Sequence, residues 1–316
     1  MALDFDFQQI SWDERAIDDC RHLIRLAVRE DLDRGLDLTT VALVSPDARG
    51  AAAVAVRHAG TVAGLLAIPL LIEEMNLQAT WTPNVVDGGV VEAGTCLGHL
   101  QGVTRDLLTG ERILLNLLGR MCGIATMTQR FVSAVENTSA RIYDTRKTTP
   151  AWRRLEKYAV RCGGGTNHRT GLFDAILIKD NHLAQSTSSG APPLSPAEAV
   201  TRARNFLAGY LTGSMPQRVL IEVEVDTLSQ FDEALSVVPD IILLDNMSTS
   251  QLRECVQRRN AAAVSVDLEA SGGITLGNVR AVAETGVDRI SLGALTHSAI
   301  SLDVGLDWDF CNFGSP

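Results

Sequence analysis

The second half of the chain alternates between short apolar runs and helical stretches, and this pattern restricts the fold more than any other feature. Six runs rich in aliphatic and β-branched residues are predicted as strands, at 141–145, 175–179, 218–225, 241–245, 263–269 and 289–293. The stretches predicted as helices lie between them, at 150–161, 196–208, 227–237, 249–259 and 275–285. Continuously apolar strands that alternate with helices are typical of a parallel sheet covered by helices.

Every predicted strand is followed by a polar or glycine-rich cluster. In chain order these clusters are TRKTTP, KDNH, EVD, DNM, EASGGI and GALTHS. Functional groups at the carboxyl ends of all strands favour a barrel related to the (β/α)₈ type over an open doubly wound sheet. Because six strands are too few for the complete type, we predict an α/β protein whose catalytic domain is an incomplete (β/α) barrel with about six parallel strands.

The first half of the chain has a different pattern. It shows an amphipathic helix at 14–30, short β-rich runs with turn signals over 51–102, and a long apolar helix at 111–136 that is interrupted near Gly123. This predicts an N-terminal α/β sandwich, a sheet with flanking helices. The expected boundaries are 1–138 for this domain and its linking helices, 139–296 for the barrel, and 297–316 for a C-terminal tail. Packing of this tail back on the N-terminal domain is one option. Residues 184–196 are predicted as an exposed loop.

The charges are unevenly distributed along the chain. From Arg141 to Lys179 there are nine lysines and arginines against three acidic residues, although the whole chain has a net charge of −10. A focused positive cleft attracts a small anion even when the whole protein is acidic. Binding along nucleic acid requires a broad basic face, which an acidic chain does not predict. The chain also shows no membrane-length apolar run and no signal peptide, so we expect a cytoplasmic protein with neither nucleic-acid nor membrane partners.

Two kinds of side chain are candidates for binding an anion in this basic region. Arginine binds carboxylates and phosphates through its planar fork, while lysine supplies a compact charge. The candidates are Arg146, Lys147, His168, Arg169 and Lys179. The cations of the next predicted helix are left out of the site, as mostly ordinary surface or intrahelical pairs: Arg153, Arg154, Lys157 and Arg161.

Two acidic residues end neighbouring predicted strands. Glu224 and Asp245 can both point into the barrel mouth and offer oxygen ligands to Mg²⁺ or to hydroxyl groups. Salt bridges to the basic loops are the alternative, and both roles are compatible. Glu222 faces the same side of its strand as Glu224 but lies one layer deeper.

Glycine-rich turns follow the last two predicted strands and indicate a phosphate site. Backbone N–H groups in such turns hold phosphate because glycine permits close approach. The residues are Ser271, Gly272, Gly273, Gly293, Ala294 and Leu295. Plain tight turns are the alternative interpretation. His297, just beyond, either contacts the phosphate or begins a helix.

Strings along most of the chain, taken together, resemble the quinolinate phosphoribosyltransferase family, also called nicotinate-nucleotide pyrophosphorylase (carboxylating). They are REDLDRGLDLTT, GERILLNLLGRMCGIAT, YDTRKTTP, LEKYAVRCGGGTNHRTGLFDAILIKDNH, IEVEVDTLSQ, ILLDNM, LEASGGI and GVDRISLGALTHSA. The resemblance implies an N-terminal α/β sandwich followed by an incomplete barrel. It also implies that quinolinate and phosphoribosyl pyrophosphate are converted to nicotinate mononucleotide, CO₂ and pyrophosphate, a step of NAD biosynthesis.

The resemblance also implies roles for single residues. It assigns a group to the quinolinate and pyrophosphate region: Thr145, Arg146, Lys147, His168, Arg169 and Lys179. Glu224 and Asp245 would bind the ribose hydroxyls and Mg²⁺, and with Lys147 and Lys179 they form the expected catalytic group. Arg112 would reach the active site of a neighbouring subunit, so the functional unit would be a homodimer or a larger homo-oligomer.

A few positions depart from the usual family pattern, namely Leu36, Cys122 and Ala151-Trp152. None of them removes an expected ligand, so they concern loop shape and subunit packing. Three alternatives stay open at this point. They are a related transferase with a changed substrate (nicotinate-type or linked to molybdenum transport), a barrel aldolase that uses Lys147 or Lys179 as a Schiff base, and an inactive binding protein.

Overall fold

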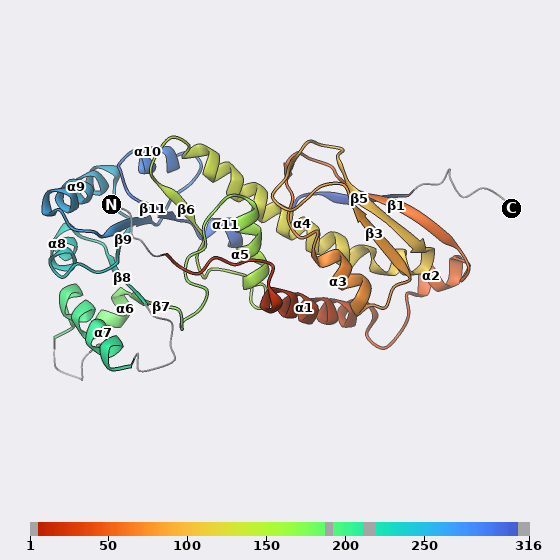
Figure 1. Ribbon diagram of the computed structural model, residues 1–316, viewed down its shortest axis with the longest axis horizontal. Coiled ribbons are helices and arrows are strands. Elements are labelled where there is room, and N and C mark those ends of the chain that lie inside the picture. Colours follow the sequence, from red (N-terminus) through yellow and green to blue (C-terminus); the bar gives the residue numbers. More distant parts are fainter. Residues whose placement is uncertain (1–5, 187–191, 211–218, 309–316) are drawn as a thin grey trace. The chain divides into compact units, whose positions relative to one another are not determined.

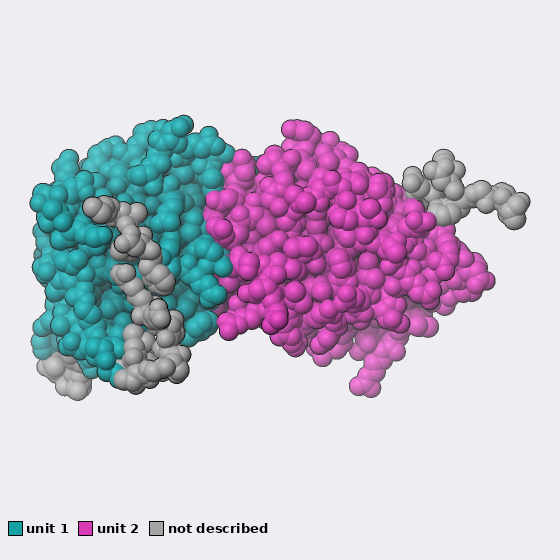
Figure 2. Space-filling model, in the orientation of Figure 1, with its two compact units in different colours: residues 1–9, 130–146, 166–293 teal, residues 10–129, 147–165, 294–316 magenta. Residues whose placement is uncertain are grey.

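A computed structural model describes residues 6–186, 192–210 and 219–308. Its contacts divide the chain into two compact units, coloured separately in Figure 2. Unit 1 comprises Met1–Gln9, Arg130–Arg146 and Thr166–Gly293. Unit 2 comprises Ile10–Gln129, Lys147–Gly165 and Ala294–Pro316. The predicted loop at 184–196 lies partly outside the described residues, because 187–191 are not described.

Unit 1 is built on a six-stranded sheet in the order β6-β11-β10-β9-β8-β7, in which every neighbouring pair is parallel (Figure 1). Its strands are β6 (Arg141–Tyr143), β7 (Ala175–Ile178), β8 (Leu220–Val225), β9 (Ile241–Asp245), β10 (Asp267–Ser271) and β11 (Arg289–Ser291). The prediction of an α/β domain with six parallel strands is confirmed. Within the described ranges, the edge strands β6 and β7 share no ladder, so the hydrogen bonds do not close a barrel.

Helices connect these strands: α6 (Asp180–Ala184), α7 (Pro196–Tyr210), α8 (Leu228–Ser236), α9 (Thr249–Ala262) and α10 (Val279–Ala283). The side chains of Thr227 and Ser248 cap α8 and α9 by accepting backbone N–H groups at the first turn. The predicted strand at 263–269 began too early. Ala263 has a φ of 52° and ends α9 in the left-handed conformation, so the strand starts only at Asp267.

Unit 2 contains a four-stranded antiparallel sheet in the order β12-β1-β5-β3. Its strands are β1 (Arg49–Val56), β3 (Ala79–Pro83), β5 (Cys96–Val103) and β12 (Val304–Trp308), and β2 (Gly60–Thr61) pairs separately with β4 (Val90–Val91). The helices are α1 (Glu14–Leu32), α2 (Leu38–Leu43), α3 (Ala67–Glu74), α4 (Thr104–Ala134, ending beyond the unit), α5 (Arg153–Cys162) and α11 (Ala294–His297). Because β12 pairs with β1, residues near the end of the chain complete a sheet begun by residues near its start.

Helix α4 is 31 residues long and continuous through Gly123, so the predicted interruption there is wrong. A Cβ atom at Gly123 would lie 2.1 Å from the carbonyl oxygen of Ile300. The glycine therefore permits close approach of another backbone segment and does not break the helix.

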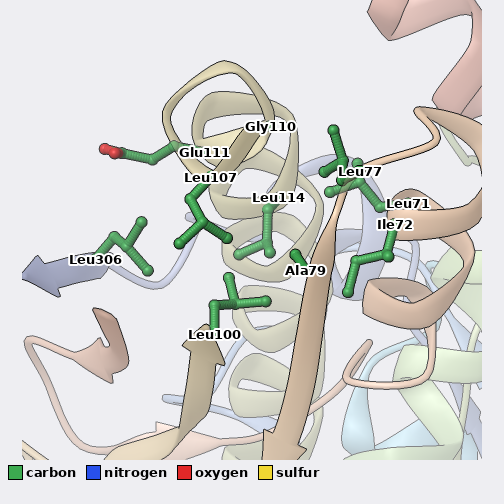
Figure 3. A pocket seen from close by; sticks show the side chains of 10 residues that line it. All are labelled: Leu71, Ile72, Leu77, Ala79, Leu100, Leu107, Gly110, Glu111, Leu114 and Leu306. Carbon is green, nitrogen blue, oxygen red and sulfur yellow. The ribbon is translucent and has the colours of Figure 1, made fainter. Parts of the chain in front are cut away.

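A small apolar pocket in unit 2 is lined by leucines from α3, α4 and the sheet (Figure 3). Leu77, Leu107 and Leu114 are among its lining residues, while the carboxylate of Glu111 points away from them. Such a lining suits packing and not a multiply charged ligand. Among the described residues, no helix has both the length and the apolar run that crossing a membrane requires.

Candidate active site

The carboxyl ends of the parallel strands in unit 1 bring basic and acidic groups to one edge of the sheet. Lys179 follows β7, and its Nζ lies 2.6 Å from Oε2 of Glu224 near the end of β8. The side chain of Lys179 is 43% exposed and that of Glu224 is 15% exposed. The pair is therefore open to solvent, and each partner keeps the other in place before a ligand arrives.

Asp245 ends β9, the strand next to β8, and is half-buried. Its Oδ2 accepts a hydrogen bond of 2.7 Å from the side-chain amide of Asn246. Two accessible carboxylates on neighbouring strands, Glu224 and Asp245, are the kind of oxygen donor that Mg²⁺ prefers. The chemistry of this donor pair therefore fits the ion expected from the sequence.

The loop after β10 is held against the loop after β9. The backbone N–H of Asn246 donates to the carbonyl of Ser271 at 2.9 Å. Gly272 has a φ of +89°, and a Cβ atom there would lie 2.2 Å from Oδ1 of Asn246. Gly273 has a φ of +61°, with open space where its Cβ would be. This loop borders a surface pocket lined also by Asn278, so its backbone is accessible to a ligand.

The surroundings of two guanidinium groups in unit 1, those of Arg146 and Arg169, favour an anion. Arg169 is 7% exposed, and its Nη1 donates to the carbonyl of Ala175 at 3.2 Å. Burial lowers the pKa of Arg169, and the charge of Arg146 lowers it further. Arg146 is half-buried, and its Nε has no hydrogen-bond partner among the described residues. An anion bound between them would relieve the repulsion and supply the missing acceptor.

Buried side chains hold the backbone of residues 167–169, hereafter the 167–169 loop. Asp144 accepts from Nδ2 of Asn167 at 2.6 Å and from the backbone N–H of His168 at 2.8 Å. Nδ1 of His168 accepts from the backbone N–H of Arg169 at 2.8 Å. The loop that carries Arg169 is therefore fixed by several hydrogen bonds, and its conformation is set before any ligand binds.

The side chain of His168 faces two buried carboxylates, those of Glu222 and Glu269. Its Nε2 lies 2.9 Å from Oε2 of Glu222 and 3.6 Å from Oε1 of Glu269, and both acids are fully buried. Burial and the charge of Glu222 raise the pKa of Glu269 to about 7, although His168 lowers it. His168, Glu222 and Glu269 are close enough for a metal site. However, the N–H donated to Nδ1 leaves the ring proton of a neutral imidazole on Nε2, so this nitrogen is not a metal ligand.

The sequence interpretation placed Glu222 one layer deeper than Glu224, and the complete burial of Glu222 agrees with this.

The predicted contact between His168 and a substrate stays a prediction, because in this conformation both ring nitrogens face protein groups. Glu269 and Asp144 were missed. Glu269 ends the predicted strand AVSVDLE, and an acid at the end of a mostly apolar strand was a usable signal.

The other predicted residues are distributed as follows. Thr145 and Gly293 are half-buried in unit 1. In unit 2, Lys147 is exposed and its carbonyl accepts from Oγ1 of Thr296 at 2.8 Å. Ala294 and Leu295 begin α11, while His297 is its last residue and therefore ends a helix instead of beginning one. Arg112 is exposed on α4.

The cations on α5 all lie in unit 2, and three of them make contacts outside their own helix instead of the expected intrahelical pairs. Arg154 pairs with Asp19 at 3.0 Å, Nε of Arg153 donates to Thr148, and Arg161 donates to the carbonyl of Gly165. Lys157 does not follow the expectation of a surface cation, because it is fully buried. Helical periodicity correctly placed Lys157 on a helix, but it did not show which face of that helix is buried.

Family models match both halves of the chain. The quinolinate phosphoribosyl transferase C-terminal domain matches residues 124–307, and the N-terminal domain of the same family matches residues 37–122. Together the two models cover most of the chain.

Individual relatives agree with these matches. The chain is 43% identical to a nicotinate-nucleotide pyrophosphorylase [carboxylating] from Mycobacterium leprae, over 92% of this chain and 97% of that protein. It is 44% identical to a probable nicotinate-nucleotide pyrophosphorylase [carboxylating] from Bacillus subtilis, over 72% of each. The structure of the nicotinate-nucleotide pyrophosphorylase from Francisella tularensis superposes with a TM-score of 0.85 at 33% identity, over 96% of this chain and all of that one.

Proposed function

The chain belongs to the quinolinate phosphoribosyltransferase family, and on this premise we propose that the site in unit 1 joins quinolinate to phosphoribosyl pyrophosphate. The products are nicotinate mononucleotide, CO₂ and pyrophosphate. The arginine pair carries this proposal: Arg169 is buried, the charge of the half-buried Arg146 lowers the pKa of Arg169, and Nε of Arg146 is a buried donor without an acceptor among the described residues. Quinolinate, with two carboxylates, supplies the negative charge and the acceptors that this pair requires.

Binding first orients the pyridine ring. Arginine forks on the carboxylates restrict the ring to one plane, and they direct its nitrogen towards the C1 carbon of the ribose. Arg169 is suited to this task because its guanidinium is buried and its backbone belongs to the fixed 167–169 loop. Little side-chain entropy remains to be lost when the substrate binds.

The ribose and its phosphates are assigned to the acidic residues and the glycine loop. Glu224 and Asp245 accept hydrogen bonds from ribose hydroxyls, and they stabilise the positive charge that develops on the sugar as pyrophosphate leaves. The N–H groups of the Ser271–Gly273 loop hold a phosphate. Mg²⁺, when bound by Glu224 and Asp245, would supply positive charge to the departing pyrophosphate. Lys179 contributes a further positive charge at the same edge.

Decarboxylation follows from the bond that forms. Once the ring nitrogen is bonded to C1 of the ribose, the ring carries a positive charge. The bond from the adjacent ring carbon to its carboxylate then breaks, CO₂ leaves, and the electron pair stays on that carbon until a proton is taken up. The protein needs no nucleophile for this step, only groups that keep the carboxylate oriented.

We further propose a homodimer or larger homo-oligomer in which Arg112, exposed on α4, completes a neighbouring subunit's site. A cytoplasmic location stays a prediction from the sequence. The family match favours the main reaction over a Schiff-base aldolase. A transferase with a changed substrate is the alternative that an assay must separate.

The test is release of CO₂ from carboxyl-labelled quinolinate. We expect release that requires both phosphoribosyl pyrophosphate and Mg²⁺, and that is lost in Arg169→Ala but kept in Arg154→Ala, which removes a half-buried pair with Asp19 in unit 2. If nicotinate is ribosylated while quinolinate releases no CO₂, the changed-substrate alternative is correct. Borohydride trapping of a substrate on Lys147 or Lys179 would indicate the aldolase.

A further inference from the structure

Four residues at the start of the described chain, Asp6 to Gln9, form a segment without helix or strand that belongs to unit 1 (hereafter the N-terminal segment). Phe7 is 5% exposed and packs in a core cluster with Tyr143, Ala175, Leu220 and Ile241. The last three of these are the first residues of β7, β8 and β9. Phe7 therefore fills the core at the amino ends of the strands.

The ring of Phe7 also contacts His168, the residue before Arg169. It stacks on the ring of His168 with centroids 4.2 Å apart and planes inclined by 28°. His168 in turn accepts the backbone N–H of Arg169. A single aromatic side chain thus touches both the core at the amino ends of the strands and the residue that fixes Arg169.

Asp6 anchors the segment by charge. Its carboxylate accepts from Nη1 of Arg289 at 2.9 Å, from the hydroxyl of Tyr143 at 2.6 Å and from Nη1 of Arg141 at 2.9 Å. Burial raises the pKa of Asp6, but Arg289, the Tyr143 hydroxyl, the backbone N–H of Phe7 and Arg141 together lower it by more, so the net shift is downward. Because the guanidinium of Arg289 is fully buried, removal of Asp6 would leave it with Asp267 as its remaining carboxylate partner.

Gln9 makes the most specific contact with the 167–169 loop. Its side-chain Nε2 donates to the carbonyl of Asn167 at 3.1 Å, and its Oε1 accepts the backbone N–H of Asn167 at 2.7 Å. One amide thus satisfies both backbone groups of a fully buried residue. With Asp144 and His168, Gln9 accounts for all three backbone N–H groups of the loop.

We propose that the N-terminal segment is part of the substrate site's support, with Gln9 and Phe7 as positioning residues that hold the 167–169 loop and through it the guanidinium of Arg169. Neither residue touches the substrate. The proposal rests on the proposed function only where it assigns Arg169 to a quinolinate carboxylate. The physical reason is that a buried backbone group without a partner is costly, so the loop would rearrange if Gln9 were removed.

The test compares Gln9→Ala with Gln8→Ala, which removes the neighbouring exposed glutamine. Removing two hydrogen bonds near the loop is expected to raise KM for quinolinate by about tenfold, while kcat and KM for phosphoribosyl pyrophosphate change by less than about twofold. Gln8→Ala should change none of them. Equal increases in both KM values, or no change in either, would overturn the proposal.

A second readout does not require activity. In Gln9→Ala the amide protons of residues 167–169 should exchange with solvent faster than in the unmodified protein, and Gln8→Ala should leave them protected. Unchanged exchange in Gln9→Ala overturns the supporting role even if kinetics change. If the unmodified protein releases no CO₂ from quinolinate, the proposed function fails, whereas faster exchange would still support the structural role of the segment.

Phe7→Leu tests the stacking contact without emptying the core. Leucine keeps most of the apolar contact with the strand ends but cannot stack on His168. We expect faster exchange at the 167–169 loop with thermal stability largely kept. A loss of thermal stability with unchanged exchange would show that Phe7 only packs the core.

Discussion

Nε2 of His168 lies 2.9 Å from Oε2 of Glu222, a carboxylate with no exposed surface. On its other side the same ring accepts the backbone N–H of Arg169. The imidazole therefore joins a buried acid to the residue assigned to quinolinate. This ion-pair contact explains why an acid is kept inside the sheet, where an isolated charge would be costly.

Replacement of Glu222 should separate loss of its charge from loss of its whole side chain. Gln fills the same space and keeps an oxygen beside Nε2 of His168, so we expect Glu222→Gln to lower the free energy of unfolding by less than about 1 kcal/mol. Glu222→Ala leaves a buried donor and a cavity and should cost about 3 kcal/mol. Urea unfolding of both variants measures the difference. Similar losses in the two would show that the charge of Glu222, and not its packing beside His168, decides the cost.

Glu269 should make stability depend on pH in an unusual direction. Burial and the charge of Glu222 raise its pKa from 4.5 to about 7, so the folded state binds its proton more tightly than the unfolded state does. The contribution of Glu269 to the free energy of unfolding is complete below about pH 4.5 and decreases as the pH rises towards 7. Glu269→Gln cannot titrate. Its free energy of unfolding, relative to the unmodified protein, should therefore rise by about 3 kcal/mol between pH 5 and pH 8. A constant difference across this range would mean that Glu269 does not take up a proton.

The two glycines after β10 should respond differently to the same change. Gly273→Ala places a methyl group in open space and is expected to cost about 1 kcal/mol, from the positive φ alone. Gly272→Ala adds a clash with Oδ1 of Asn246, so it should cost roughly 2 kcal/mol more and raise KM for phosphoribosyl pyrophosphate further. Thermal unfolding and steady-state kinetics measure both effects. Equal losses would mean that the loop moves away from Asn246 without cost.

A second glycine pair tests packing along α4. Gly110 faces the apolar pocket of Figure 3, and its added Cβ would lie 3.0 Å from Cδ1 of Leu77, a flexible end beside open space. Gly110→Ala should therefore stabilise the protein by about 1 kcal/mol through helix propensity. Gly123→Ala would meet the carbonyl oxygen of Ile300 at 2.1 Å and should destabilise it by about 2 kcal/mol. Calorimetry that ranks the two in the opposite order would contradict this account of the helix.

Shared active sites predict recovery of activity on mixing. Arg112→Ala and Lys147→Ala should each be inactive alone. A mixed dimer would contain one site with both residues intact, so activity should return to at most about a quarter of the unmodified level after random exchange. The check requires proof of subunit exchange, for example by mass spectrometry of differently labelled chains. No activity in a proven mixture would show that Arg112 acts within its own chain.

Local sequence patterns were sufficient for most strands of unit 1 and for the position of the candidate groups along them. The apolar runs at 241–245 and 175–179 became β9 and β7, ending within one residue of the predicted positions. Glu224 and Asp245 occur at or near strand ends, and parallel strands bring such ends to one edge. These features could be predicted because periodicity and strand direction depend on neighbouring residues.

The pairing of buried charges was decided only by the tertiary structure. Asp6 reaches Arg289 across 283 positions of sequence, Gln9 reaches Asn167 across 158, and Lys157 is buried although its helix pattern resembles that of a surface cation. A buried charge or backbone group is tolerated only when a partner lies within hydrogen-bond distance. That partner can come from any part of the chain. The sequence alone therefore determined the strands and the candidate groups at their ends, while the tertiary structure decided which distant residues make the burial of charge possible.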